Sequence, residues 1–153
     1  MNTSAFSVID VAKQEFVGAV LVDEPDRGAA GIWSIACDDK HIFITHSGTH
    51  EVSVIDHPAM LAKFESYKDK SRLDYDLNFL YGLRERVTLQ GNGPRNFIFS
   101  GDKLIIPTYF ADILNTVDIN TLEVTATDMN PGRTETPENK GEKYFNDANH
   151  CYQ

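Results

Sequence analysis

Four of the five histidines lie close together in the chain, between residues 41 and 57. Imidazole groups bind zinc and copper and act as acids and bases near neutral pH. His46 and His50 flank Ser47-Gly48-Thr49, a predicted turn in which Gly48 can take a positive φ. No Cys or carboxylate stands at a standard ligand spacing, and strand alternation scatters the four rings. We therefore predict no metal site, and keep His46 and His50 as candidate ligand-binding residues, with a polar role at the turn as the alternative.

A second candidate is Arg95, in the loop Gly91-Asn92-Gly93-Pro94-Arg95-Asn96 that enters a predicted strand. Arg27 occupies an equivalent loop earlier in the chain. A guanidinium offers planar, paired donors that match a carboxylate or phosphate, so Arg95 is a candidate for binding an anionic ligand. The alternative is a salt bridge to one of the 23 acidic residues. We expect Trp33 and Tyr109 to pack within the sheets rather than form a stacking surface.

Composition excludes several classes of function. The 14 basic and 23 acidic residues give a formal charge of −9, and no basic stripe is present, which argues against binding nucleic acid. No apolar run approaches the ~20 residues that a spanning helix needs, so membrane insertion is not expected. The start, Met1–Ala5, lacks the basic and apolar regions of a signal peptide. No nucleophile–base motif or phosphate-binding loop occurs, and no catalytic residue is predicted.

The chain has two cysteines, Cys37 and Cys151, too few for a disulfide framework. They can pair with each other. Because Cys37 falls in an apolar predicted strand, a buried thiol is the expected state.

Strand-like segments recur along the chain. Ser7-Val8-Ile9-Asp10 is repeated as Ser53-Val54-Ile55-Asp56, 46 residues later (Asp10 to Asp56), and more weakly as Thr116-Val117-Asp118. Strands are predicted at 6–10, 15–22, 31–36, 41–46, 51–56, 86–89, 96–99, 103–108, 113–119 and 122–127. Repeats of about 40–50 residues with four short strands are typical of propeller blades. We predict an all-β fold, a partial β-propeller of about two four-stranded antiparallel blades plus extra strands.

In this prediction the segment 6–10 ends one blade, the strand 15–22 opens the next, and the strand 122–127 starts a further one. The hairpin 41–56 forms the outer half of its blade. Residues 1–129 form the propeller part, with a helical insert at about 58–83, where Pro58 fits a first helical turn and the apolar residues follow helical spacing. Residues 130–140 read as a linker, and 141–153 as the start of a truncated C-terminal segment with a short helix.

The repeated segments resemble a known family. Ser53-Val54-Ile55-Asp56 and Ser7-Val8-Ile9-Asp10 are similar to the strand motif of YVTN-type β-propeller repeats. The longer run 45–56, followed by Pro58, resembles a subgroup in which a di-haem cytochrome c peroxidase-like domain follows the propeller. Gly141-Glu142-Lys143-Tyr144-Phe145-Asn146-Asp147 looks like the helix before the first haem-attachment motif. The family has about seven blades, so this chain resembles its last blades and the linker.

The resemblance implies a non-catalytic scaffold or binding module, a fragment of a propeller–cytochrome c fusion. The parent would be periplasmic or extracellular, and Arg95 could pair with a haem propionate of the adjoining domain. No cofactor is expected in this chain, since haem c would belong to a missing downstream domain. The expected partners are missing blades or another copy of the chain, because isolated blades leave apolar faces uncovered. The alternative function is part of a lactonase-like propeller hydrolase with a channel metal.

Overall fold

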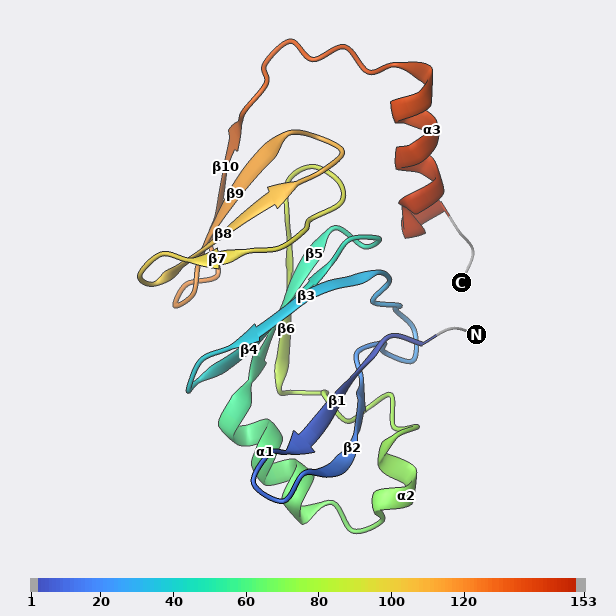
Figure 1. Ribbon diagram of the computed structural model, residues 1–153, viewed down its shortest axis with the longest axis vertical. Coiled ribbons are helices and arrows are strands. Elements are labelled where there is room, and N and C mark those ends of the chain that lie inside the picture. The colour runs from blue at the N-terminus through green and yellow to red at the C-terminus, as the bar shows by residue number, and fades with distance from the viewer. Residues whose placement is uncertain (1–2, 151–153) are drawn as a thin grey trace.

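The computed structural model describes residues 3–150 and confirms the predicted fold class. The chain is all-β, with antiparallel sheets arranged as blades of a partial β-propeller (Figure 1). The first sheet has two strands, β1 (Ala5–Asp10) and β2 (Glu15–Leu21). The central sheet has four, β3 (Ile32–Cys37), β4 (His41–His46), β5 (Glu51–Asp56) and β6 (Arg84–Thr88). The last sheet also has four, β7 (Ile98–Phe99), β8 (Lys103–Thr108), β9 (Ile113–Asp118) and β10 (Val124–Asp128).

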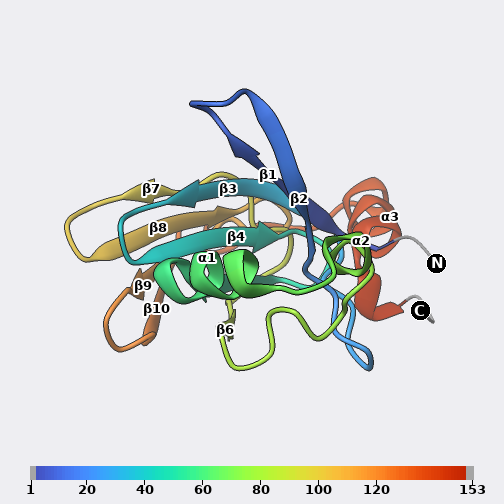
Figure 2. The same ribbon diagram turned by 90° about the horizontal axis from the view of Figure 1, so that it is seen from below.

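The blade boundaries lie one strand away from the predicted ones. β2 pairs with β1 and completes the first sheet instead of opening the second, and β10 pairs with β9 instead of starting a new sheet. β6 likewise closes the central sheet against β5. The strand order is therefore β3-β4-β5-β6 and β7-β8-β9-β10, with β3 and β7 on one side of the stack and β6 and β10 on the other (Figure 2). The motif repeats fit this order, since they fall in β1, β5 and β9, each of which is followed by the last strand of its sheet.

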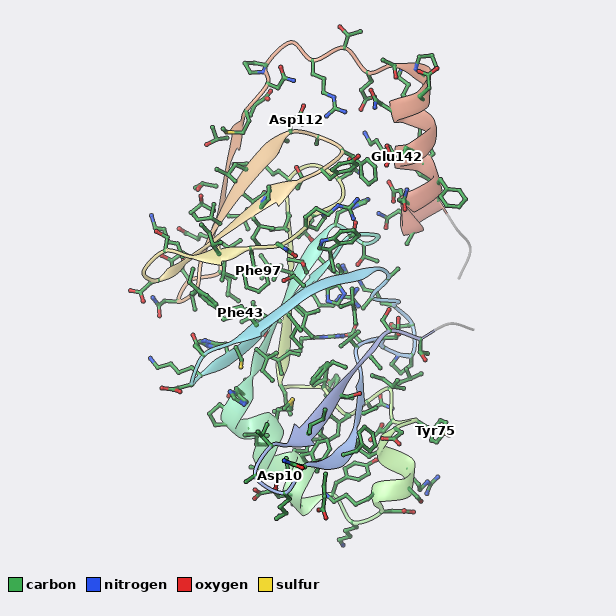
Figure 3. The ribbon with its side chains drawn as sticks, viewed as in Figure 1. Asp10, Phe43, Tyr75, Phe97, Asp112 and Glu142 are labelled. Atoms are coloured by element: carbon green, nitrogen blue, oxygen red, sulfur yellow. The ribbon has the colours of Figure 1, made fainter. Side chains whose placement is uncertain are left out.

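The hairpin β4–β5 is consequently the middle of a blade and not its outer half. Its strands are buried along nearly their whole length because both faces of the central sheet are covered. Ile42 and Ile44 face a cluster that includes Val20 of β2, and Phe43 faces a cluster with Leu104 of β8. Figure 3 shows Phe43 beside Phe97 between the central and last sheets, with ring centroids 6.3 Å apart. This burial on both faces explains the continuous apolar run at 42–44.

The segment between β5 and β6 carries two helices, α1 (His57–Ser66) and α2 (Lys70–Leu73). Asp56 caps α1 by accepting a hydrogen bond from the Ala59 amide (2.9 Å), and Pro58 lies in the first turn. Met60, Phe64 and Leu73 are buried against the first and central sheets. The helical part of the insert predicted at about 58–83 ends at Leu73, and mostly turns occupy the residues from there to β6.

The turn between β4 and β5 differs from its predicted geometry. The positive φ falls on His50 (φ 56) and not on Gly48. Gly48 is required for another reason: a Cβ there would lie 3.1 Å from the Ala30 carbonyl oxygen and 3.3 Å from the Ala148 Cβ. A glycine at this position lets two other segments approach the turn closely.

After β10 the chain forms helix α3 (Pro137–Asn146) and a 3₁₀ turn, η1 (Ala148–His150). α3 begins inside the interval that was expected to be a linker. Thr136 caps it by accepting a hydrogen bond from the Asn139 amide (3.2 Å), and Pro137 occupies the first turn. The pair Thr136-Pro137 is a helix-start signal that the sequence already contained. None of the helices within residues 3–150 is long and apolar enough to cross a membrane.

Cys37 is exposed, which corrects the expectation of a buried thiol. It ends β3 opposite Ile42, on the face toward the first sheet. Cys37 lines an open space between the first and central sheets together with residues of β1 and α1, so its thiol is accessible to solvent. Cys151 lies outside the described residues.

Candidate functional site

One end of the central and last sheets carries the turns and loops that bring the candidate residues together. We call this end the loop rim; it comprises the β2–β3 loop (22–31), the β4–β5 turn (47–50), the β6–β7 loop (89–97) and the β8–β9 turn (109–112). The rim lies opposite the end from which α1 leaves β5. Helix α3 lies beside the loop rim (Figure 1).

Arg95 is held at the loop rim by backbone contacts between its segment and the end of β8. Its amide donates to the Pro107 carbonyl (3.1 Å), and Pro94 forms a β-bridge with Thr108. Gly93 (φ 70) packs so closely on the Phe110 ring that a Cβ at this position would clash with a ring carbon. The segment before β7 is therefore fixed in position, and with it the base of the Arg95 side chain.

Three aromatic rings surround the Arg95 guanidinium. Its central carbon lies 3.7 Å from the Trp33 ring centroid, 4.7 Å from that of Tyr109 and 5.5 Å from that of Phe110. Such contacts are cation–π interactions. Trp33 sits at an irregularity of β3, where the register shifts between Ile32 and Ser34, and a β-bulge of this kind re-aims a side chain. The expectation that Trp33 and Tyr109 are packing residues is thus wrong, since both are about half exposed (53% and 54%).

The only side-chain acceptor for Arg95 within residues 3–150 is the Ser47 hydroxyl, 3.1 Å from Nη1. No carboxylate of the described part of the chain lies within ion-pair distance of Arg95. Arg27, in the equivalent loop, differs: its guanidinium pairs with the fully buried Glu51 at 2.9 Å. Arg27 has the salt bridge that was the alternative for Arg95, and Arg95 keeps a charge that is not neutralised by a pair.

Glu51 belongs to a buried ionic network on the face of the central sheet toward the first sheet. Arg86 contacts its carboxylate, and both Arg84 and Arg86 reach Glu24 of the β2–β3 loop. Arg86 also donates to the Gly28 carbonyl (2.6 Å). Glu51 was not singled out from the sequence, because its two partners come from strands and loops far along the chain. The network ties the β2–β3 loop to the sheet and leaves none of these charges free for a ligand.

His46 lies inside this same face and not on the loop rim. Its side chain is fully buried, and Nε2 is 2.8 Å from the Ser53 hydroxyl. Burial lowers the pKa of His46 to about 4, and the Arg86 and Arg84 charges act in the same direction, while Glu51 opposes them. The ring is therefore neutral at physiological pH and closed off from a ligand in solvent.

His50 joins three parts of the loop rim. Its Nδ1 accepts a hydrogen bond from the Gly93 amide (3.1 Å), and its Nε2 lies 3.0 Å from Asp147 and 2.9 Å from the Asn92 side-chain nitrogen. Asn92 donates to the same carboxylate (3.2 Å). Burial raises the pKa of Asp147, but hydrogen bonds from the Asn149 amide and His50 outweigh burial and hold that pKa below its usual value. His46 and His50 thus face different partners, and His50 docks the end of α3 onto the rim.

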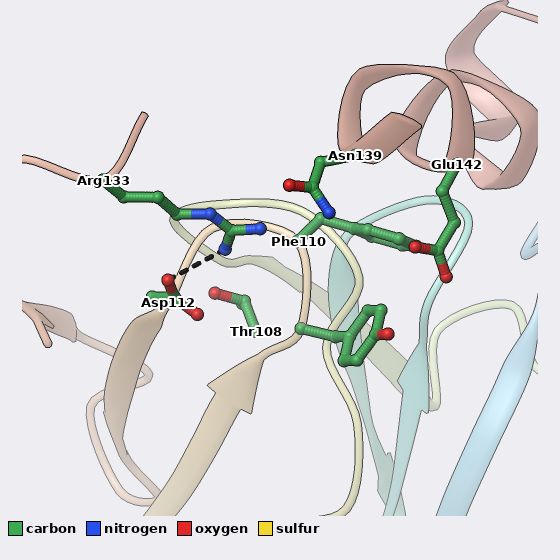
Figure 4. Close-up of a pocket in the computed structure, with 7 residues that line it drawn as sticks. Thr108, Phe110, Asp112, Arg133, Asn139 and Glu142 are labelled. Carbon is green, nitrogen blue, oxygen red and sulfur yellow. Dashed lines mark ion pairs between the residues drawn. The ribbon is translucent and has the colours of Figure 1, made fainter. Parts of the chain in front are cut away.

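A cavity of about 430 Å³ adjoins the Arg95 cluster, between the β8–β9 turn and α3 (Figure 4). Its lining residues come from the end of β8, the β8–β9 turn, the segment between β10 and α3, and α3 itself: Thr108, Tyr109, Phe110, Asp112, Arg133, Asn139 and Glu142. Arg133 is paired with Asp112 at 2.8 Å. Tyr109 and Phe110 belong both to the cavity lining and to the rings around Arg95, so the two features share a wall.

Within residues 3–150 no group of three or more His, Cys, Asp or Glu side chains is arranged to hold a metal ion. The loop rim presents a fixed cation surrounded by aromatic rings, an arrangement suited to binding a ligand. Of the three candidate residues, the structure places Arg95 at the surface of the rim, His50 beneath it and His46 in the sheet. The aromatic partners of Arg95 were not predicted, and no local sequence signal marks them.

Comparison with models of known protein families found no match, and no curated protein matched either. Among solved structures the chain is similar to Kuenenia stuttgartiensis hydrazine synthase, with a TM-score of 0.63 and 22% sequence identity. The alignment covers 83% of this chain and 35% of that chain, so the present chain spans about a third of the structure that it matches. At this identity the likeness concerns the fold alone. The sheets and this likeness define the chain as propeller-like, and its particular function is a matter of proposal.

Proposed function

We propose that this chain is a non-catalytic binding module of a β-propeller protein, and that it binds an anionic group of a ligand or partner at Arg95. The observation that carries the proposal is the Arg95 guanidinium, held among three aromatic rings at the loop rim without a carboxylate partner in the described part of the chain. An arginine fixed in this way has lost side-chain freedom before a ligand arrives. Its charge is then available for an incoming carboxylate or phosphate.

The finer identity is proposed on sequence resemblance. The Ser-Val-Ile-Asp repeats support a YVTN-type propeller. The segment 141–147, which forms the second half of α3 and its C-cap, supports a place next to a cytochrome c-like domain in a periplasmic or extracellular parent protein. Covalent haem attachment needs the pattern C-x-x-C-H, which the sequence with its Cys37 and Cys151 does not contain. The cysteines of this chain therefore do not fit covalent haem attachment, and in this proposal haem c belongs to a domain beyond this chain. The other proposed partners of the chain are further blades or a second copy of it.

The anion site is tested by titrating the protein with sodium acetate and with inorganic phosphate at constant ionic strength. Trp33 is the only tryptophan, so its fluorescence reports directly on the Arg95 site. We expect a saturable change with wild-type protein and its loss in Arg95→Gln. Arg72→Gln is the matched control, because it removes the same charge at an exposed position on α2.

Arg95→Lys separates charge from geometry. Lysine retains the positive charge but cannot form the paired, planar contact, so we expect weaker carboxylate binding than in wild-type protein. The proposal fails if neither anion gives a saturable response, or if Arg95→Gln responds as the wild type does while remaining folded by circular dichroism.

A further inference from the structure

We infer that the Arg95 site selects flat, conjugated carboxylates, that is aromatic or heteroaromatic acids, over aliphatic acids of equal charge. The inference deepens the proposed function and rests on it. It starts from how the guanidinium is presented. Nη1 donates to the Ser47 hydroxyl, and no acceptor within residues 3–150 is assigned to Nε or Nη2. Within residues 3–150 neither of these two atoms is a fully buried donor without a partner, so each keeps some contact with solvent.

The Nε–Nη2 edge is one of the two edges with which arginine binds a carboxylate through two parallel hydrogen bonds. A carboxylate on this edge is coplanar with the guanidinium. The body of the acid then extends away from Arg95 in that same plane. A flat acid continues the plane, whereas a puckered one departs from it.

Aromatic rings lie beside this plane, and the guanidinium covers only part of their surface. Trp33 and Tyr109 contact the guanidinium, yet about half of each side chain is still exposed. Arg95 therefore covers only part of each ring, and the rest is available to a bound molecule. Aromatic rings prefer offset stacked or edge-to-face contacts with another π system, which an aliphatic acid cannot provide.

Two of the rings around Arg95 also form a wall of the neighbouring cavity. Tyr109 and Phe110 line the space of about 430 Å³ between the β8–β9 turn and α3. Their rings lie edge to face, with centroids 5.0 Å apart, and the close contact with Gly93 fixes the position of the Phe110 ring. A site with a rigid aromatic wall and room beyond it accepts a ring larger than the guanidinium itself.

The test compares sodium benzoate with cyclohexanecarboxylate and acetate by isothermal titration calorimetry at pH 7 and constant ionic strength. Benzoate and cyclohexanecarboxylate have similar size and equal charge, but only benzoate is flat and conjugated. We expect benzoate to bind roughly tenfold more tightly than acetate, with cyclohexanecarboxylate well below benzoate. Trp33→Leu is expected to abolish the advantage of benzoate and to keep acetate binding, while Trp33→Phe restores part of the advantage.

The outcomes separate this inference from the proposed function. If acetate binds through Arg95 but benzoate binds no better than cyclohexanecarboxylate, the selectivity is disproved and the anion site stands. If Trp33→Leu remains folded and keeps the full advantage of benzoate, the aromatic wall is disproved. If benzoate binding persists in Arg95→Gln, it occurs elsewhere and the inference is overturned. If no acid binds the wild-type protein, both the inference and the proposed function fail.

Discussion

Burial decides what each candidate residue of this chain can do. Arg27 and Arg95 begin in equivalent loops, but Arg27 meets the buried carboxylate of Glu51 and Arg95 meets three rings. A guanidinium paired with a buried carboxylate is costly to separate, so Arg27 is committed to the fold. Ring contacts leave the net charge in place, and Arg95 can still bind an anion.

The lowered pKa of buried His46 predicts that the free energy of unfolding depends measurably on pH. Its pKa in the folded protein is about 4, against 6.5 for a free histidine, so between these values the unfolded chain binds more protons. Stability is therefore full above pH 6.5 and falls as the pH drops toward 4, by about 2–3 kcal/mol. Urea denaturation at pH 7.5 and pH 4.5 measures this loss. We expect His46→Gln to lose less stability over the interval than wild-type protein, and equal losses would contradict the assignment.

At the scale of the elements, close contacts at glycine residues fix loops against their neighbours. Gly93 in the β6–β7 loop has φ 70 and touches the Phe110 ring, whereas Gly101 in the β7–β8 turn has φ 59 and open space around it. Both positions strain an L side chain, but only the first also creates a clash. Because Phe110 lies against Arg95, the packing of this loop is linked to the candidate site.

The pair Gly93→Ala and Gly101→Ala isolates that contact. We expect Gly101→Ala to cost about 1 kcal/mol of unfolding free energy, from backbone strain alone. Gly93→Ala should cost about 2–4 kcal/mol, since strain and overpacking add, and it should also weaken anion binding at Arg95. Urea denaturation measures both variants. Equal destabilisation by the two substitutions would show that the Phe110 ring moves aside freely.

At the scale of the whole molecule, the first sheet is smaller than the other two. It has two strands where the other two sheets have four. Ile9 and Phe16 face each other across β1 and β2 and are both largely exposed (59% and 61%). Unpaired edges and exposed apolar strands favour association with further strands. A partial propeller of this kind is therefore expected to associate or to be only marginally stable.

Sedimentation velocity over a range of protein concentrations tests this expectation. We expect the wild-type chain to sediment faster as its concentration rises, and Ile9→Lys combined with Phe16→Lys to reduce this association. Tyr81→Lys is the control, because Tyr81 is even more exposed (86%) but belongs to the segment between β5 and β6. A wild-type monomer at all concentrations, with one cooperative thermal transition, would contradict the prediction.

The sequence alone determined where the strands of this protein lie. The bounds of β4, β5 and β8 follow from apolar runs, alternation and turn residues, and the spacing of the Ser-Val-Ile-Asp repeats predicted propeller blades. These signals are readable because they depend on neighbours within a few residues. The start of α3 was equally readable from Thr136 and Pro137 and was missed.

Only the tertiary structure decided how the strands are grouped and which side chains are free. An antiparallel strand can pair on either edge, so the sequence did not determine whether β2 and β6 end one blade or begin the next. The burial of His46, the exposure of Cys37 and the ring contacts of Arg95 depend on segments tens of residues apart. Trp33, Arg95 and Tyr109 share no sequence pattern, and the packing of two blades is what brings them together.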